Sequence, residues 1–280
     1  MDKLIIAKAA AVFTASVLTA CGMAGNSERE DSNGELSSVS AKQVMITAEG
    51  AKADISALST EKHGYGQGVL VDDKNRTTGA LDFNSAYGKY SAAAINEDTD
   101  SITLTFDQGY ENGYTAKILD TLKEKKVRAV FFLVQDYAER NPELVQRMID
   151  EGHTVANHSV HHYSMPSLAP ETARAEIMDF HKYMKDNFGV EMKLFRPPMG
   201  EFSEQSLAVT QECGYKTMLW SFAYADWNVD DQPEPSAALE KLRSAAHPGA
   251  IYLLHSVSST NAQILGDLID GLRADGFELE

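Results

Sequence analysis

The sequence has few cysteines, a minority of basic residues and no glycine motif for nucleotide binding. Only Cys21 and Cys213 are present; the second lies at a predicted helix end, where we expect a structural role. Lysine and arginine number 25 against 41 acidic residues, and the net charge of −16 argues against nucleic acid, because phosphate binding needs basic patches. No dinucleotide fingerprint or phosphate loop appears, which argues against a nucleotide ligand. An acidic surface still allows a neutral or zwitterionic glycan as partner.

The first twenty residues predict an export signal. Residues 9–17 form an apolar run after two early lysines, too short to be a membrane span. Leu18-Thr19-Ala20-Cys21 matches the bacterial lipobox, so residues 1–20 resemble a lipoprotein signal peptide. The resemblance implies cleavage before Cys21 and a lipid on its sulfur. An ordinary secretory signal or a short anchor is the alternative.

Two further segments precede the main domain. Residues 21–43 are rich in Ser, Glu, Asn and Gly, and predict a flexible tether. Residues 44–96 form an extension in which Val44-Met45-Ile46 and Val69-Leu70-Val71 are compatible with short strands. Its aromatic residues Phe83, Tyr87 and Tyr90 suggest packing on the main domain, residues 97–280.

From about residue 101 the pattern alternates between strands and helices. Expected strands cover 101–106, 127–134, 153–156, 192–195, 216–220 and 250–254. Expected helices cover 113–126, 142–151, 170–188, 203–213, 235–246 and 261–274, and a final strand is plausible over 276–280. Such alternation predicts an α/β fold with parallel strands. The number of repeats favours a distorted or incomplete (β/α) barrel over an open doubly wound sheet.

Polar side chains follow the strands at their carboxyl ends, the edge of a parallel sheet where active sites usually lie. Asp107 ends the first strand, although a strand followed by an Asx turn explains that stretch equally well. His158 and His162 follow the third strand, and in a helical turn their spacing of four would offer two imidazoles to one metal. His161 would point elsewhere. A polar loop without metal is the alternative.

The later strands end in three more polar groups. Arg196 precedes two prolines that fix the backbone, and its guanidinium could clamp a carboxylate. Asp226 stands beside Trp227, and His255 closes the last strand. Each group has an ordinary explanation alone: a surface arginine, a capping aspartate, a core histidine. Their convergence on one edge predicts an active site.

Taken in order, these motifs resemble the polysaccharide deacetylases of carbohydrate esterase family 4, the NodB-homology family. The shared motifs are Thr105-Phe106-Asp107-Gln108-Gly109, His158 to His162, Arg196 to Gly200, Asp226-Trp227 and the Leu-x-His ending at His255. A closer likeness is to the delta-lactam-biosynthetic de-N-acetylases, through Gly109 to Thr115, Ser164-Met165-Pro166 and Leu253 to Ser258. Their substrate is N-acetylmuramic acid in peptidoglycan without stem peptide. The freed amine then forms the muramic lactam of spore cortex.

The resemblance implies a role for each site residue. His158 and His162 would bind a divalent metal, Zn²⁺ above all, with Asp107 as general base held by Arg196. His255 would be the general acid, with Asp226 tuning its pKa. Substrate contacts would come from Tyr110, Pro198, Met199 and Trp227. Gln108 departs from the wider family, where an aspartate binds the metal; an amide oxygen is a weaker ligand, which leaves the identity and affinity of the metal open.

Other functions stay open at this stage. N-acetylglucosamine or a chitin-like oligomer is an alternative substrate. A cell-wall-binding lipoprotein without catalysis rests only on Gln108, and a transporter's binding lipoprotein would normally have two lobes. We expect a protein anchored by lipid on the extracytoplasmic face of the membrane, facing the peptidoglycan strand. It would be secreted if the lipobox is not used.

Overall fold

The structure, a computed structural model, describes residues 54–279. The predicted signal segment 1–20, the lipidation site Cys21, the tether 21–43 and the strand at Val44-Met45-Ile46 therefore lie outside the described residues. Ala53–Glu280 forms one compact unit. No helix in the described part of the chain is long and apolar enough to cross a membrane.

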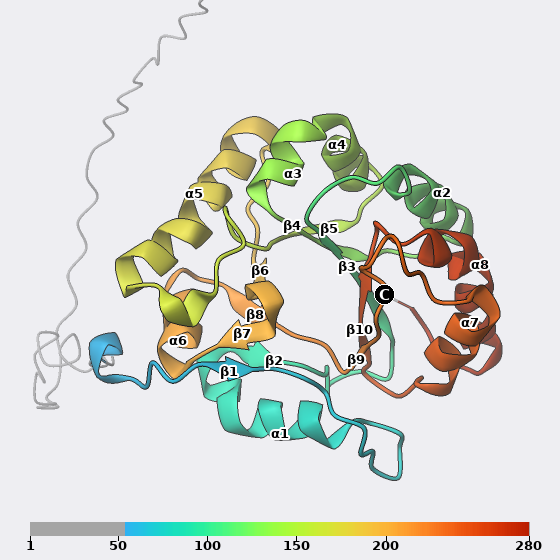
Figure 1. Ribbon diagram of the computed structural model, residues 1–280, viewed down its shortest axis with the longest axis horizontal. Coiled ribbons are helices and arrows are strands. Elements are labelled where there is room, and N and C mark those ends of the chain that lie inside the picture. The colour runs from blue at the N-terminus through green and yellow to red at the C-terminus, as the bar shows by residue number, and fades with distance from the viewer. Residues whose placement is uncertain (1–53, 280) are drawn as a thin grey trace, which may run out of the picture. The chain divides into compact units, whose positions relative to one another are not determined.

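A curled sheet of eight parallel strands forms the centre of the unit, with helices around its outside (Figure 1). The strand order is β2-β8-β6-β5-β4-β3-β10-β9, so β3 lies between β4 and β10. The predicted distorted (β/α) barrel is confirmed. The strands are β2 (Ala92–Ala93), β3 (Thr103–Gln108), β4 (Val130–Leu133), β5 (Thr154–Asn157), β6 (Leu194–Phe195), β8 (Lys216–Met218), β9 (Phe222–Ala223) and β10 (Ile251–His255).

The helices that connect these strands bury one face against the sheet. They are α2 (Thr115–Lys125), α3 (Gln135–Arg140), α4 (Pro142–Asp150), α5 (Pro170–Phe188), α6 (Glu204–Glu212), α7 (Pro235–Ser244) and α8 (Ser259–Ala274). All six expected strands and all six expected helices are present, with ends shifted by at most three residues. The main core lies between the sheet and these helices, and includes Phe106, Phe131 and Leu268.

Two expected strands are wrong. Residues 69–71 form an exposed loop in which Val69 is 93% exposed and Val71 makes only an isolated bridge to Thr77. The expected final strand is likewise reduced to one bridge between Leu279 and Ile102. Both segments have β-branched or aromatic residues, but neither has a neighbour along its length that could complete a hydrogen-bonded ladder.

The extension before the catalytic domain is part of the same folded unit. Its helix α1 (Thr78–Tyr87) was not expected, whereas β2 joins the edge of the main sheet beside β8. Phe83 packs edge-on against Phe202, with ring centroids 5.2 Å apart. Phe202 belongs to β7 (Glu201–Phe202), which forms a small antiparallel ribbon with β1 (His63–Gly64). The extension thus shares a second hydrophobic core with the barrel.

The barrel has a seam, because β2 and β9 are the two edge strands and do not pair with each other. Side chains of the extension bond the backbone on the β9 side. The Thr77 hydroxyl donates to the carbonyl of Ser221 at 3.1 Å, and the Gln67 amide donates to that of Ala223 at 3.2 Å. These bonds link the extension to the open edge.

Candidate active site

Asp107 lies at the carboxyl end of β3, almost fully buried. Its Oδ1 accepts a hydrogen bond from Arg196 Nη1 at 2.6 Å, and its Oδ2 lies 3.5 Å from His158 Nε2. Burial alone would raise the pKa of the Asp107 carboxyl, but the positive charge and hydrogen bond of Arg196 outweigh burial and hold this pKa below its ordinary value. The carboxylate is therefore ionised and directed toward the histidines.

Arg196 is a fully buried guanidinium inside the barrel. Besides Asp107, it donates to the hydroxyl of Thr105 at 2.9 Å and to the carbonyls of Met218 and Leu219, each at 3.0 Å. Its guanidinium carbon lies 4.1 Å from the centre of the Phe132 ring. These contacts fix the position of the Arg196 guanidinium, which in turn holds the Asp107 carboxylate.

His158 and His162 lie on a loop after β5. The helical turn expected for them is wrong, because Ser159 and His162 have left-handed backbone angles (φ 74° and 59°). The loop still brings the two rings together, with centroids 4.8 Å apart and planes at 74°. His158 Nδ1 donates to the carbonyl of Arg196 at 2.7 Å, which leaves its Nε2 as the free lone pair. Burial lowers the pKa of His158 to about 4 and also lowers that of His162, so both imidazoles are neutral, the form that binds metals.

The donor set of this loop suits a divalent metal only in part. Within residues 54–279, no three His, Cys, Asp or Glu side chains come close enough to hold a metal. Gln108 is fully buried, and its Nε2 donates to the hydroxyl of Ser256 at 2.6 Å. Among the described residues its Oε1 has no hydrogen-bond partner. Two neutral imidazoles therefore fit a metal, whereas Gln108, the expected further ligand, carries an uncharged oxygen and is not among the residues that line the cavity with them.

His255 ends β10 beside Asp107, its neighbour in the sheet register. Its Nδ1 donates to Asp226 Oδ1 at 2.7 Å, and its backbone N–H donates to Asp226 Oδ2 at 2.8 Å. Burial would lower the pKa of His255, but the hydrogen bond and negative charge of Asp226 outweigh it and raise this pKa. Asn261 also donates to Asp226 Oδ2, at 2.6 Å. Sequence reasoning missed Asn261, because an asparagine in the first turn of a helix has many ordinary explanations.

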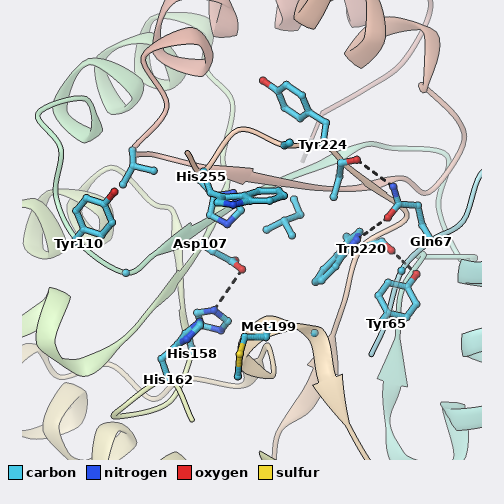
Figure 2. A pocket seen from close by; sticks show the side chains of 18 residues that line it. Tyr65, Gln67, Asp107, Tyr110, His158, His162, Met199, Trp220, Tyr224 and His255 are labelled. Carbon is cyan, nitrogen blue, oxygen red and sulfur yellow. Dashed lines mark hydrogen bonds and ion pairs between the residues drawn. The ribbon is translucent and has the colours of Figure 1, made fainter. Parts of the chain in front are cut away.

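A cavity of about 730 Å³ is lined by Asp107, His158, His162 and His255 (Figure 2). Three of the expected substrate-contacting residues line it and are roughly half exposed: Tyr110, Met199 and Trp227. Trp227 stands edge-on to His255, with ring centroids 6.0 Å apart. Pro198, by contrast, is buried and is not among the lining residues.

The extension supplies part of the cavity wall, which the sequence did not reveal. Tyr65, Gly66 and Gln67 all line it. The Tyr65 hydroxyl donates to the carbonyl of Trp220 at 2.6 Å, and Gln67 Oε1 accepts from Trp220 Nε1 at 2.9 Å, as Figure 2 shows. The only signal was an aromatic residue within a glycine-rich run, which is equally typical of a turn.

The segment from Tyr110 to Thr115 holds the loop rather than lining the cavity, Tyr110 excepted. Glu111 accepts hydrogen bonds from the backbone of Gly113 at 2.6 Å and from the Thr115 hydroxyl at 2.5 Å. Asn112 donates to the carbonyl of Val257 at 2.9 Å. These hydrogen bonds fix the conformation of the loop that follows β3.

Comparison with known proteins points to one family. A sequence model described as polysaccharide deacetylase matches residues 94–218. The peptidoglycan-N-acetylmuramic acid deacetylase PdaA of Bacillus subtilis is 38% identical over 230 residues, which cover 81% of this chain and 87% of the relative. The solved structure of that PdaA, described as a family 4 carbohydrate esterase, matches with a TM-score of 0.75 and 36% identity, over 80% of this chain and 96% of the other. A peptidoglycan-N-acetylglucosamine deacetylase of Bacillus cereus is 31% identical, over 63% of this chain and 83% of the relative.

Proposed function

Because the chain belongs to the polysaccharide deacetylase family, we propose that it hydrolyses N-acetyl groups of peptidoglycan amino sugars, chiefly N-acetylmuramic acid. The observation that carries the proposal is the pairing, across one cavity, of Asp107, whose pKa is lowered, with His255, whose pKa is raised. Two groups with opposite shifts at one site are suited to serve as base and acid. The likeness to PdaA, named for N-acetylmuramic acid, supports that sugar.

The base side of the reaction would rest on Asp107. Its ionised carboxylate can take a proton from the attacking water, because Arg196 occupies one oxygen and leaves Oδ2 directed toward the histidines. Metal dependence is typical of this family, and we propose that His158 and His162 hold Zn²⁺. When bound, the metal would supply a Lewis acid for the acetyl oxygen and lower the pKa of water.

The acid side would rest on His255. With Nδ1 bonded to Asp226, the protonated ring has its Nε2–H available for the sugar nitrogen. Proton transfer to that nitrogen accompanies cleavage of the C–N bond and releases acetate and a free amine. On muramic acid this amine would close on the lactyl carboxyl, and a role in spore cortex is part of the proposal.

N-acetylglucosamine is the second candidate substrate. The residues that line the cavity include no lysine or arginine, so apart from the protonated His255, whose Nε2–H serves the sugar nitrogen, they offer no side-chain cation to pair with a lactyl carboxylate. A neutral sugar needs no such partner, and the Bacillus cereus relative is named for it.

We also propose that the protein is anchored by lipid on the extracytoplasmic face of the membrane. The support is the Leu18-Thr19-Ala20-Cys21 sequence. Mass spectrometry of the N-terminal peptide from the membrane fraction tests it: a diacylglyceryl mass on Cys21 is expected. An unmodified N-terminus in the culture medium would point to secretion.

The experiment that tests the activity is acetate release from purified peptidoglycan, with and without stem peptides. Zn²⁺-dependent release that stops with a chelator and prefers peptide-free strands is expected. If glycan strands in which N-acetylglucosamine is the only acetylated sugar release as much acetate as peptide-free peptidoglycan, the substrate would be assigned as N-acetylglucosamine. A folded protein that releases no acetate under any metal would refute the proposal.

A further inference from the structure

A second hollow, of about 450 Å³, adjoins the catalytic cavity. It is lined by Gly109, Val134, Asp136, Val160, His161, His162 and Tyr163. Gly109 and His162 also line the catalytic cavity, so the two hollows meet at these residues. A ligand extending from the catalytic groups past His162 would enter this hollow.

A stacked aromatic pair lines the hollow. The rings of His161 and Tyr163 are 5.1 Å apart with planes at 16°, and Tyr163 is 51% exposed. The buried carboxylate of Glu176 fixes the His161 ring, on which Tyr163 stacks, because it accepts from His161 Nδ1 at 2.6 Å and from the His161 backbone N–H at 2.8 Å. The platform is thus preorganised before any ligand arrives.

Exposed aromatic side chains gather at this edge of the barrel. Of the large hydrophobic side chains that are exposed in the described chain, the aromatic ones are Tyr110, Tyr163 and Trp227. Tyr110 and Trp227 line the catalytic cavity, and Tyr163 lines the adjoining hollow. Such clustering of exposed apolar surface indicates a binding site, and pyranose rings present apolar C–H faces that pack on aromatic rings.

We infer that this hollow is a saccharide subsite for the sugar next to the reacting one in the same glycan strand. The inference rests on the proposed function for the reacting sugar. Asp136 lines the hollow, and its carboxylate is paired with Arg140, whose Nε lies 2.7 and 2.8 Å from the two oxygens; the remaining lone pairs can accept hydrogen bonds from sugar hydroxyls. The residues that line this hollow include no lysine or arginine to pair with a carboxylate, so the occupant is a neutral N-acetylhexosamine rather than a sugar that bears a free carboxylate.

Titration calorimetry with N-acetylmuramic acid and with peptide-free peptidoglycan tetrasaccharide, in chelator to prevent turnover, tests this subsite. Tyr163→Ala should lower the ratio of tetrasaccharide to N-acetylmuramic acid affinity by about tenfold, the loss typical when a contact aromatic is removed. Tyr163→Phe keeps the ring and should restore the ratio. Leu70→Ala truncates a comparably exposed apolar side chain outside both hollows and should leave the ratio unchanged. Thermal unfolding of each variant checks the fold.

An unchanged ratio in folded Tyr163→Ala overturns the subsite. An effect seen only when the glycan carries stem peptides would also overturn it, because the hollow would then hold peptide. Acetate release by the wild type is measured separately on the same glycans. Length-dependent binding without release would refute the proposed activity while supporting the subsite, so the two failures are distinguishable.

Discussion

Replacement of Asp107 by asparagine separates chemistry from folding at this site. The amide keeps an oxygen that can accept from Arg196 Nη1, now 2.6 Å from the carboxylate, and has nearly the same shape. It cannot, however, take a proton from water. Arg196 keeps its bonds to Thr105, Met218 and Leu219 and its contact with Phe132, so its buried charge retains partners.

The expected effects on rate and stability differ in size. Loss of a general base lowers the rate by about 10²–10⁴-fold, which is roughly 3–5 kcal/mol of activation free energy. Weakening one charged hydrogen bond should cost about 1.5–2 kcal/mol of unfolding free energy, which lowers Tm by roughly 3–8 °C for a unit of this size. Because stability is typically about 5–15 kcal/mol, the variant stays folded at 25 °C and unfolding cannot explain the lost rate.

The assay is acetate release from peptide-free peptidoglycan, with Tm measured on the same samples. Asp275→Asn is the matched control, since it removes a carboxylate from an exposed pair with Arg243 at 2.8 Å. Such pairs contribute only about 0–1 kcal/mol, and release should not change. Wild-type release by Asp107→Asn would refute the assignment of Asp107 as the base.

Three further predictions concern the acid, the metal and the loop. Asp226→Asn removes the negative charge that raises the pKa of His255, so the alkaline limb of kcat/KM against pH should move to lower pH; a limb that stays in place would count against His255 as the acid. Gln108→Asp restores a charged oxygen and should bind Zn²⁺ more tightly in competition with a chromophoric chelator, whereas weaker binding would exclude Gln108 from the metal site. Glu111→Ala removes the acceptor for Gly113 and Thr115 and should cost about 1–2 kcal/mol, as helix caps do; an unchanged Tm would show that this contact is dispensable.

The sequence predicted the barrel and the polar groups at its strand ends, because both depend on local pattern. Buried parallel strands form apolar runs, and the residue that ends each run must lie at the carboxyl edge. Asp107, Arg196 and His255 follow from this rule alone. The contact between the first two required only that their strands belong to one curled sheet.

What the sequence could not predict depends on long-range packing. Left-handed angles at Ser159 and His162 replace the expected helical turn, and Glu176 on a distant helix bonds this loop. Helix α1 was missed because Gly79 weakens its helical pattern. A Cβ there would lie 2.6 Å from the carbonyl oxygen of Gln67. The glycine is therefore needed so that the cavity-lining segment around Gln67 can pack closely against α1.

The seam between β2 and β9 makes the stiffness of the barrel uneven. Central strands such as β3 are bonded on both sides along their backbones, whereas the β9 side depends on side-chain bonds from Thr77 and Gln67. Such bonds can break without disrupting the backbone hydrogen bonds between strands, so local opening should begin here. Backbone amides near Ala223 should therefore exchange with solvent deuterium before those of β3. The same stretch precedes Asp226, which bonds the general acid His255. The position of the acid therefore depends on the part of the barrel that opens first. Thermal inactivation should therefore precede global unfolding.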